Sequence, residues 1–132
     1  MNNVLILGFG VASTAYISLL DHNKKKVSVV GTPYDVKKIK SLKAAKIKKE
    51  SNFGLIFSKN IYFYENLEEV NSKQYSLIVV GVNSNGIFWA ADQLKKLKAT
   101  CPVLILTKGL HKEKGKIYTM SDFFKSRTGF KK

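Results

Sequence analysis

"VLILGFGVAS" (residues 4–13) is an apolar run that leads directly into two glycines, Gly8 and Gly10. The run predicts a buried β-strand, and the residues after the glycines predict a helix. A strand, a Gly-x-Gly turn and a helix in this order are typical of a loop that binds the pyrophosphate of a dinucleotide. The first glycine permits the tight turn, and the second lets the backbone approach phosphate at the start of the helix. Ser13 stands at the third position of that motif, where glycine or alanine allows close packing. We expect the loop to bind phosphate still, with slightly wider packing at Ser13.

Strand and helix patterns alternate along the rest of the chain. Predicted strands cover residues 4–7, 27–30, 61–63, 77–82 and 103–106; predicted helices cover 11–21, 36–45, 66–70 and 85–97, and a last helix, after a polar loop that follows Gly109, uses Ile117, Met120 and Phe124. Such alternation favours parallel pairing through right-handed crossovers. The sequence therefore predicts one α/β domain, residues 1–132, with a Rossmann-like, doubly wound and mainly parallel sheet covered by helices on both faces.

Four short segments lie at or just after the ends of predicted strands: residues 8–10, 31–32, 82–83 and 108–109. In a doubly wound sheet, ligands bind beyond the carboxyl ends of the strands. We therefore expect these four segments to line one crevice.

The residues after the second strand bear on the choice of cofactor. An acidic residue that binds the adenine ribose is expected about 20 residues after the glycine loop. Gly31 has no carboxylate, Asp35 comes several residues late, and Lys37 and Lys38 follow. The missing acid and the nearby positive charge slightly favour the 2′-phosphate of NADP, but exposure to solvent explains the lysines more simply. NAD and NADP both stay open.

The formal charge of +14 raises nucleic-acid binding as an alternative. Arg127 is the single arginine among the 23 basic residues, and arginine is the residue that binds bases and phosphates in bidentate fashion. The lysines cluster where solvated helix faces and loops are expected. We therefore do not expect a nucleic-acid partner, and the lysine-rich segment 36–49 is the candidate surface for that alternative.

Other sequence features exclude several classes of protein. No apolar run approaches the length of about 18 residues that spans a membrane. The N-terminus lacks the pattern of a signal peptide, so we expect a cytoplasmic protein. Cys101 is the single cysteine, which excludes an intrachain disulfide and a cysteine zinc site, and we predict no metal.

"VLILTKGLHKEKGKIYTMSDFF" (residues 103–124) is the most specific stretch of the chain. Its strand ending in Thr-Lys-Gly, followed by a polar loop, Gly-Lys and a helix, resembles the NAD(P)-dependent glycerol-3-phosphate dehydrogenases. The resemblance extends through "VLILGFGVASTA", "VSVVGTPYDVKKI", "YENLEEV" and "LIVVGVNSNGIFWAADQL". It covers essentially the whole chain as the N-terminal cofactor domain of that family.

The resemblance implies NAD or NADP as cofactor and hydride transfer between nicotinamide and dihydroxyacetone phosphate, which gives sn-glycerol 3-phosphate. It implies a cofactor site made of Gly8, Phe9, Gly10, Val11, Ala12, Ser13, Thr32, Val82, Asn83 and Lys108. Lys108 is also the implied catalytic and substrate-binding residue. A lysine at a strand end is suited to this role because its ammonium group polarises a ketone oxygen and attracts a phosphate.

The chain departs from the family pattern at several positions. Val11 and Ala12 stand where the family usually has serine and an aromatic residue, Thr32 replaces a basic residue or histidine, and Asn83 replaces proline. These changes put cofactor affinity in doubt.

The chain also ends at Lys132, about where the family continues into a helical substrate domain with a second lysine. We expect that C-terminal domain to be absent from this chain, and the chain alone to bind cofactor without turnover. A stand-alone dinucleotide-binding or sensing module is the main alternative. Phe123, Phe124 and Phe130 would form an exposed apolar patch if a second domain normally covers them, and a homodimer is then possible.

Overall fold

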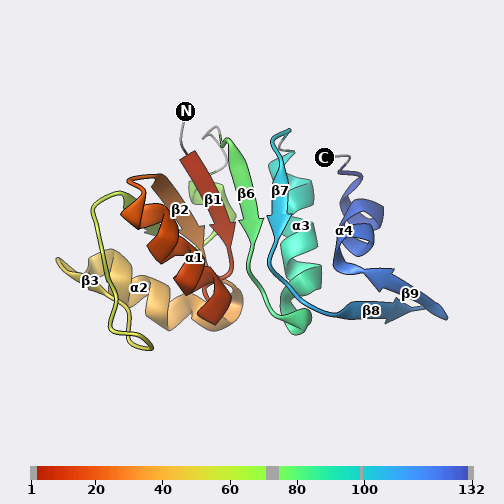
Figure 1. The fold of residues 1–132 in the computed structure, drawn as a ribbon, viewed down its shortest axis with the longest axis horizontal. Coiled ribbons are helices and arrows are strands. Elements are labelled where there is room, and N and C mark those ends of the chain that lie inside the picture. The colour runs from red at the N-terminus through yellow and green to blue at the C-terminus, as the bar shows by residue number, and fades with distance from the viewer. Residues whose placement is uncertain (1–2, 71–74, 99, 131–132) are drawn as a thin grey trace.

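The computed structural model describes residues 3–70, 75–98 and 100–130, so Lys132 lies outside the described residues. A five-stranded sheet forms its centre (Figure 1). The strands are β1 (Asn3–Leu7), β2 (Lys26–Val30), β5 (Ile61–Tyr64), β6 (Leu77–Val80) and β7 (Val103–Ile105). Their order is β5-β2-β1-β6-β7, and every neighbouring pair is parallel.

Helices cover both faces of this sheet (Figure 1). They are α1 (Val11–His22), α2 (Val36–Ala44), α3 (Ile87–Leu97) and α4 (Met120–Thr128), with short 3₁₀ turns η1 (Pro33–Asp35), η2 (Leu67–Glu69) and η3 (Ser84–Gly86). Two antiparallel pairs lie outside the main sheet: β3 (Lys48–Lys49) with β4 (Ile56–Phe57), and β8 (Leu110–Glu113) with β9 (Lys116–Thr119).

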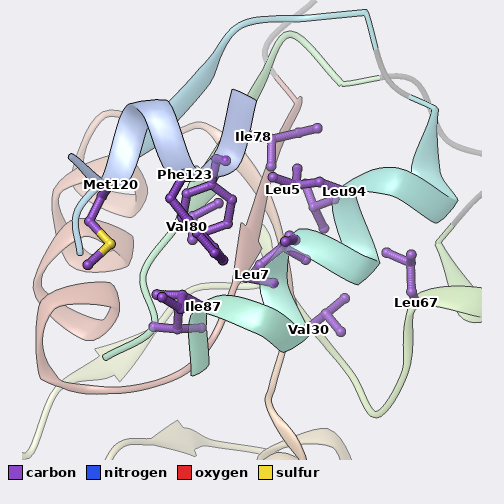
Figure 2. Packing of buried hydrophobic residues seen from close by; sticks show 14 of the residues in the cluster. Leu5, Leu7, Val30, Leu67, Ile78, Val80, Ile87, Leu94, Met120 and Phe123 are labelled. Atoms are coloured by element: carbon purple, nitrogen blue, oxygen red, sulfur yellow. The ribbon is translucent and has the colours of Figure 1, made fainter. Parts of the chain in front are cut away.

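Alternate residues of β1 divide the core into two layers, because successive side chains of a strand point to opposite faces. Val4 and Ile6 pack with residues of α1 and α2, whereas Leu5 and Leu7 pack with residues of α3 and α4. Figure 2 shows the second layer, in which Phe123 of α4 lies among apolar side chains of the sheet and α3. The predicted doubly wound Rossmann-like fold is therefore confirmed.

The sheet reverses its winding direction between β1 and β6. From β1 the chain proceeds to β2 and β5 on one side, and later from β6 to β7 on the other. Ligands of open α/β sheets bind at such a switch point, beyond the carboxyl ends of the strands. The loops that follow β1 and β6 occupy this position, at the lower edge of the sheet in Figure 1.

The segment after Gly109 differs from the prediction. It forms a β-hairpin instead of a polar loop, and the last helix begins only at Met120. Lys114 and Gly115 have φ values of 49° and 76°, the positive values of a two-residue type I′ turn. Ile117, predicted to lie on the helix, is on β9 with 68% of its surface exposed.

Two predictions about burial are also wrong. Phe123 and Phe124 lie in the core at 2% and 3% exposure, so they form no exposed patch. The strand predicted at 103–106 is less buried than expected, because β7 is at the edge of the sheet and Leu104 is 37% exposed. No helix among the described residues combines the length and apolar character needed to cross a membrane.

Candidate functional site

Ser13, at the third position of the glycine motif, is accommodated by a glycine on the neighbouring strand. Its side chain is fully buried, and its hydroxyl donates a 2.9 Å hydrogen bond to the carbonyl oxygen of Gly81. A Cβ atom at Gly81 would lie 1.9 Å from the Ser13 Oγ. The missing third glycine of the motif is thus compensated by a glycine directly after β6, and α1 still packs closely on the sheet.

The two glycines of the loop differ in what surrounds them. Gly8 has φ of +99°, and a Cβ there would lie 2.8 Å from Val82 Cγ1, so the fold itself requires glycine. Gly10 has an ordinary φ of −97°, and no heavy atom lies within 4 Å of its ideal Cβ position. No contact within the described chain explains a glycine at position 10. The open space there fits a ligand that approaches the backbone closely.

The start of α1 offers free backbone donors next to Gly10. Gly10 is the N-cap residue and provides no side-chain cap, and the first turn contains no acidic residue. Val11 and Ala12 are exposed there. Uncapped N–H groups and the positive end of the helix dipole favour an anion such as pyrophosphate. The residues present therefore fit the cofactor that the loop predicts.

Phe9, between the two glycines, faces the interior. The residue is 2% exposed, and its ring packs edge-on against Phe63 with centroids 5.4 Å apart. Its backbone N–H donates a 3.2 Å hydrogen bond to the carboxylate of Asp35. The predicted role of Phe9 at the cofactor site therefore rests on the backbone position of the loop rather than on its side chain.

Asp35 reaches back from η1 toward the end of β2. Its Oδ2 accepts hydrogen bonds from the Thr32 N–H and the Thr32 hydroxyl, both at 2.9 Å. Together with the bond from Phe9, this carboxylate connects the turn after β2 to the glycine loop after β1. The spacing rule had placed Asp35 too late for the ribose side. The Thr-x-x-Asp capping pattern at residues 32–35 is the sequence signal that predicts these hydrogen bonds between Thr32 and Asp35.

The segment after β6 lies against the glycine loop. Val82 is 7% exposed and packs beneath Gly8 and Gly86, whereas Asn83 is exposed. The Asn83 Oδ1 accepts a 3.1 Å hydrogen bond from the N–H of Asn85 and caps η3. The helix predicted over residues 85–97 begins later than expected, because Asn85 lies inside η3 and α3 begins after Gly86.

Lys108 follows β7 and is exposed. The hydroxyl of the preceding Thr107 donates a 2.6 Å hydrogen bond to the carbonyl oxygen of Val82. This bond ties the turn that carries Lys108 to the segment after β6. The next residue, Gly109, has φ of +103° and directs the chain into the hairpin.

A hollow of about 290 Å³ lies beside the glycine loop. Its lining includes Phe9 and Thr14 near the start of α1, and the lysines Lys37, Lys38 and Lys49. The sequence analysis singled out Lys37 and Lys38 but missed Lys49 and the hollow itself. Residues 49–52 lie near Phe9 and Thr14 only in the folded chain. The arrangement adds positive charge next to the N-terminal end of α1.

The sequence model of the family described as "NAD-dependent glycerol-3-phosphate dehydrogenase N-terminus" matches residues 3–132. The chain belongs to this family. The resemblance predicted from the sequence is thereby confirmed, and membership implies NAD(P) as the cofactor. A search of curated proteins found no match.

Solved structures agree with this fold. The chain is similar to a glycerol-3-phosphate dehydrogenase from Coxiella burnetii, with a TM-score of 0.80 and 21% identity over 97% of this chain and 38% of that one. It is also similar to the enzyme from Saccharomyces cerevisiae, with a TM-score of 0.75 and 15% identity over 97% of this chain and 39% of that one. This chain therefore spans less than two-fifths of the length of either structure.

Proposed function

We propose that this chain is the part of a glycerol-3-phosphate dehydrogenase that holds the dinucleotide for hydride transfer between NAD(P)H and dihydroxyacetone phosphate, which gives sn-glycerol 3-phosphate. The observation that carries the proposal is Gly10, a glycine that the chain's own packing does not require, at the uncapped start of α1. The cofactor, when bound, supplies or accepts the hydride. The chain's own residues bind and orient it.

Each predicted residue has a specific part in this proposal. The loop from Gly8 to Ser13 binds the pyrophosphate, with the N–H groups of Val11 and Ala12 as donors. Thr32 lies on the adenine-ribose side, and Val82 and Asn83 border the nicotinamide. The support for this division is the position of each segment just beyond the carboxyl end of a strand of the same parallel sheet.

Lys108 is the proposed catalytic residue. Its ammonium group would hold the ketone oxygen of dihydroxyacetone phosphate and stabilise the negative charge that develops on this oxygen as hydride reaches C2. The hydrogen bond from Thr107 to Val82 supports this role, because it fixes the base of the lysine relative to the nicotinamide side. A solvated lysine with no partner in catalysis is the alternative that an experiment must exclude.

The substitution Gly10→Ala tests the proposal. The Cβ enters open space at an ordinary φ, so the free energy of unfolding should stay within about 0.5 kcal/mol of wild type or rise slightly. The same methyl group occupies the place of the pyrophosphate, and NADH affinity, measured by fluorescence titration, should fall about tenfold or more. Gly129→Ala, at a glycine in the C-terminal region, is the control and should leave NADH affinity unchanged. Equal NADH affinity for wild type and Gly10→Ala would contradict a pyrophosphate site at this loop.

The role of Lys108 has its own test. Dihydroxyacetone phosphate should strengthen NADH binding to the wild-type protein and have no such effect on Lys108→Met, while Lys112→Met on the exposed part of β8 behaves like wild type. We expect the isolated chain to oxidise NADH negligibly. NADH affinity that responds neither to dihydroxyacetone phosphate nor to Lys108→Met would favour a binding or sensing module without chemistry.

A further inference from the structure

The carboxylate of Asp35 lies between two segments that frame the ribose side of the proposed dinucleotide site. It accepts a hydrogen bond from Phe9 in the glycine loop after β1 and two from Thr32 in the turn after β2. In a doubly wound dinucleotide domain, the adenine ribose lies beside the end of the second strand, next to the glycine loop. Asp35 therefore occupies this place although it is five residues beyond Val30, the last residue of β2.

Oδ2 is the acceptor in all three of these hydrogen bonds. Asp35 is only half-buried, so Oδ1 can accept hydrogen bonds from hydroxyl groups outside the chain. A carboxylate that accepts from the ribose hydroxyls is how dinucleotide domains recognise NAD.

The same arrangement is unfavourable for a 2′-phosphate. A phosphate at the end of β2 needs hydrogen-bond donors, and two donors at this point, the N–H and hydroxyl of Thr32, already bind Asp35. The carboxylate adds a negative charge at this point, and like charges held close together repel.

We infer that Asp35 is the residue that selects NAD(H) over NADP(H), by accepting the ribose hydroxyls and repelling a 2′-phosphate. The inference rests on the proposed function, because it needs a dinucleotide at the glycine loop. It reverses the slight preference for NADP that the missing acid at the strand end suggested.

Lys37 and Lys38 do not oppose this conclusion. Both are exposed, and with Lys49 they line the hollow beside Phe9 and Thr14. Exposed ammonium groups attract anions through solvent and are screened by salt, so they strengthen the binding of both dinucleotides and add only a small extra attraction for the 2′-phosphate. The carboxylate, in contrast, is within hydrogen-bond distance of the residues that frame the ribose side.

Titration of the chain with NADH and with NADPH, followed by nicotinamide fluorescence, tests the inference without any turnover. Wild-type protein should bind NADH about tenfold or more tightly than NADPH. Asp35→Asn keeps an acceptor oxygen for the capping turn and removes the charge, so it should bring the two affinities within about threefold, mainly by strengthening NADPH binding. Asp92→Asn, an equal change of charge on the exposed face of α3, should leave the wild-type ratio unchanged.

The wild-type ratio decides the inference even if Asp35→Asn fails to fold, which circular dichroism would show. Equal or tighter binding of NADPH by wild type would overturn the inference and leave the proposed function intact. A folded Asp35→Asn variant with the wild-type ratio would also overturn it. If neither dinucleotide binds, the proposed function fails and the inference fails with it.

Discussion

The turn after β1 and the turn after β7 contain glycines with almost the same φ in very different surroundings. Gly8 has φ of +99° and Gly109 has φ of +103°. A Cβ at Gly8 would lie 2.8 Å from Val82 Cγ1 and 3.0 Å from the carbonyl oxygen of Gly81, whereas nothing lies within 4 Å of a Cβ at Gly109. The first turn is packed against the core, and the second is in contact with solvent.

This difference separates what the fold requires from what a ligand requires. In and next to the packed turn, Gly8 and Ser13 are fixed by Gly81 and Val82 in the segment that follows β6, so their identities report on folding. Gly10 and Lys108 have no such neighbour among the contacts that the structure gives, and a functional explanation rests on these two positions. A glycine motif therefore contains some residues that folding requires and others that packing does not explain, and only the structure distinguishes the two.

The largest expected effect is that of Gly8→Ala. The substitution combines a positive φ with two close contacts, one of them to backbone that cannot rotate away, and should lower the free energy of unfolding by about 3 kcal/mol or more. Gly109→Ala has almost the same φ but open space around the new methyl group, so it measures the backbone strain alone. It should lower the free energy of unfolding by about 1 to 2 kcal/mol. Urea denaturation of both variants measures the difference. Equal losses would show that packing around Gly8 is looser than its contacts indicate.

Gly81→Ala comes next. The new methyl group would lie 1.9 Å from the Ser13 Oγ, and moving that hydroxyl aside breaks a buried hydrogen bond, so we expect a loss of about 2 kcal/mol. Ser13→Gly in the same chain removes the obstacle and should restore much of the stability, less about 1 kcal/mol for glycine inside a helix. A double-mutant cycle from urea denaturation gives the coupling between the two sites. Additive losses would refute the direct contact.

These positions also show how far sequence reasoning reaches. The buried strands were predictable because runs such as Leu77–Val80 are apolar without interruption, and the glycine loop because its motif is local. The hydrogen-bond partner of Ser13 was not predictable, since Gly81 is 68 residues away and only the β1–β6 pairing brings it close. The hydrogen bonds of Asp35 to Phe9 and Thr32 were not predicted for a related reason: counting residues ignores a capping turn that folds the chain back.

The hairpin after Gly109 was missed for a different physical reason. Its strands lie outside the core and bury few side chains, and both Leu110 and Ile117 are mostly exposed. The strict alternation of apolar and polar residues that reveals a half-buried strand is therefore missing from the sequence. The signal that was present is the Lys114-Gly115 pair, two residues with positive φ between two four-residue strands. Exposed hairpins of this kind are encoded mainly by their turns.

Thr107→Val should have a smaller effect on stability. It preserves shape and removes the hydrogen bond to the carbonyl oxygen of Val82, at a cost of about 1 kcal/mol. Because the bond positions the turn, the response of NADH binding to dihydroxyacetone phosphate should weaken while the affinity for NADH alone is unchanged. Thr100→Val, at an exposed threonine before β7, is the matched control. Loss of affinity for NADH alone would mean that Thr107 contributes to the cofactor site directly.

The smallest effect is expected from Ile117→Thr on the outer face of the hairpin. The side chain is 68% exposed, and threonine is also well suited to a strand, so the free energy of unfolding should change by less than about 0.5 kcal/mol. The same measurement at several protein concentrations tests whether a second copy covers this face. A stability of the wild type that rises with concentration, and is lost in Ile117→Thr, would show that the hairpin is buried in a dimer. The contrast between a packed and a solvated turn would then hold only for the monomer, because the environment of Gly109 would change on association.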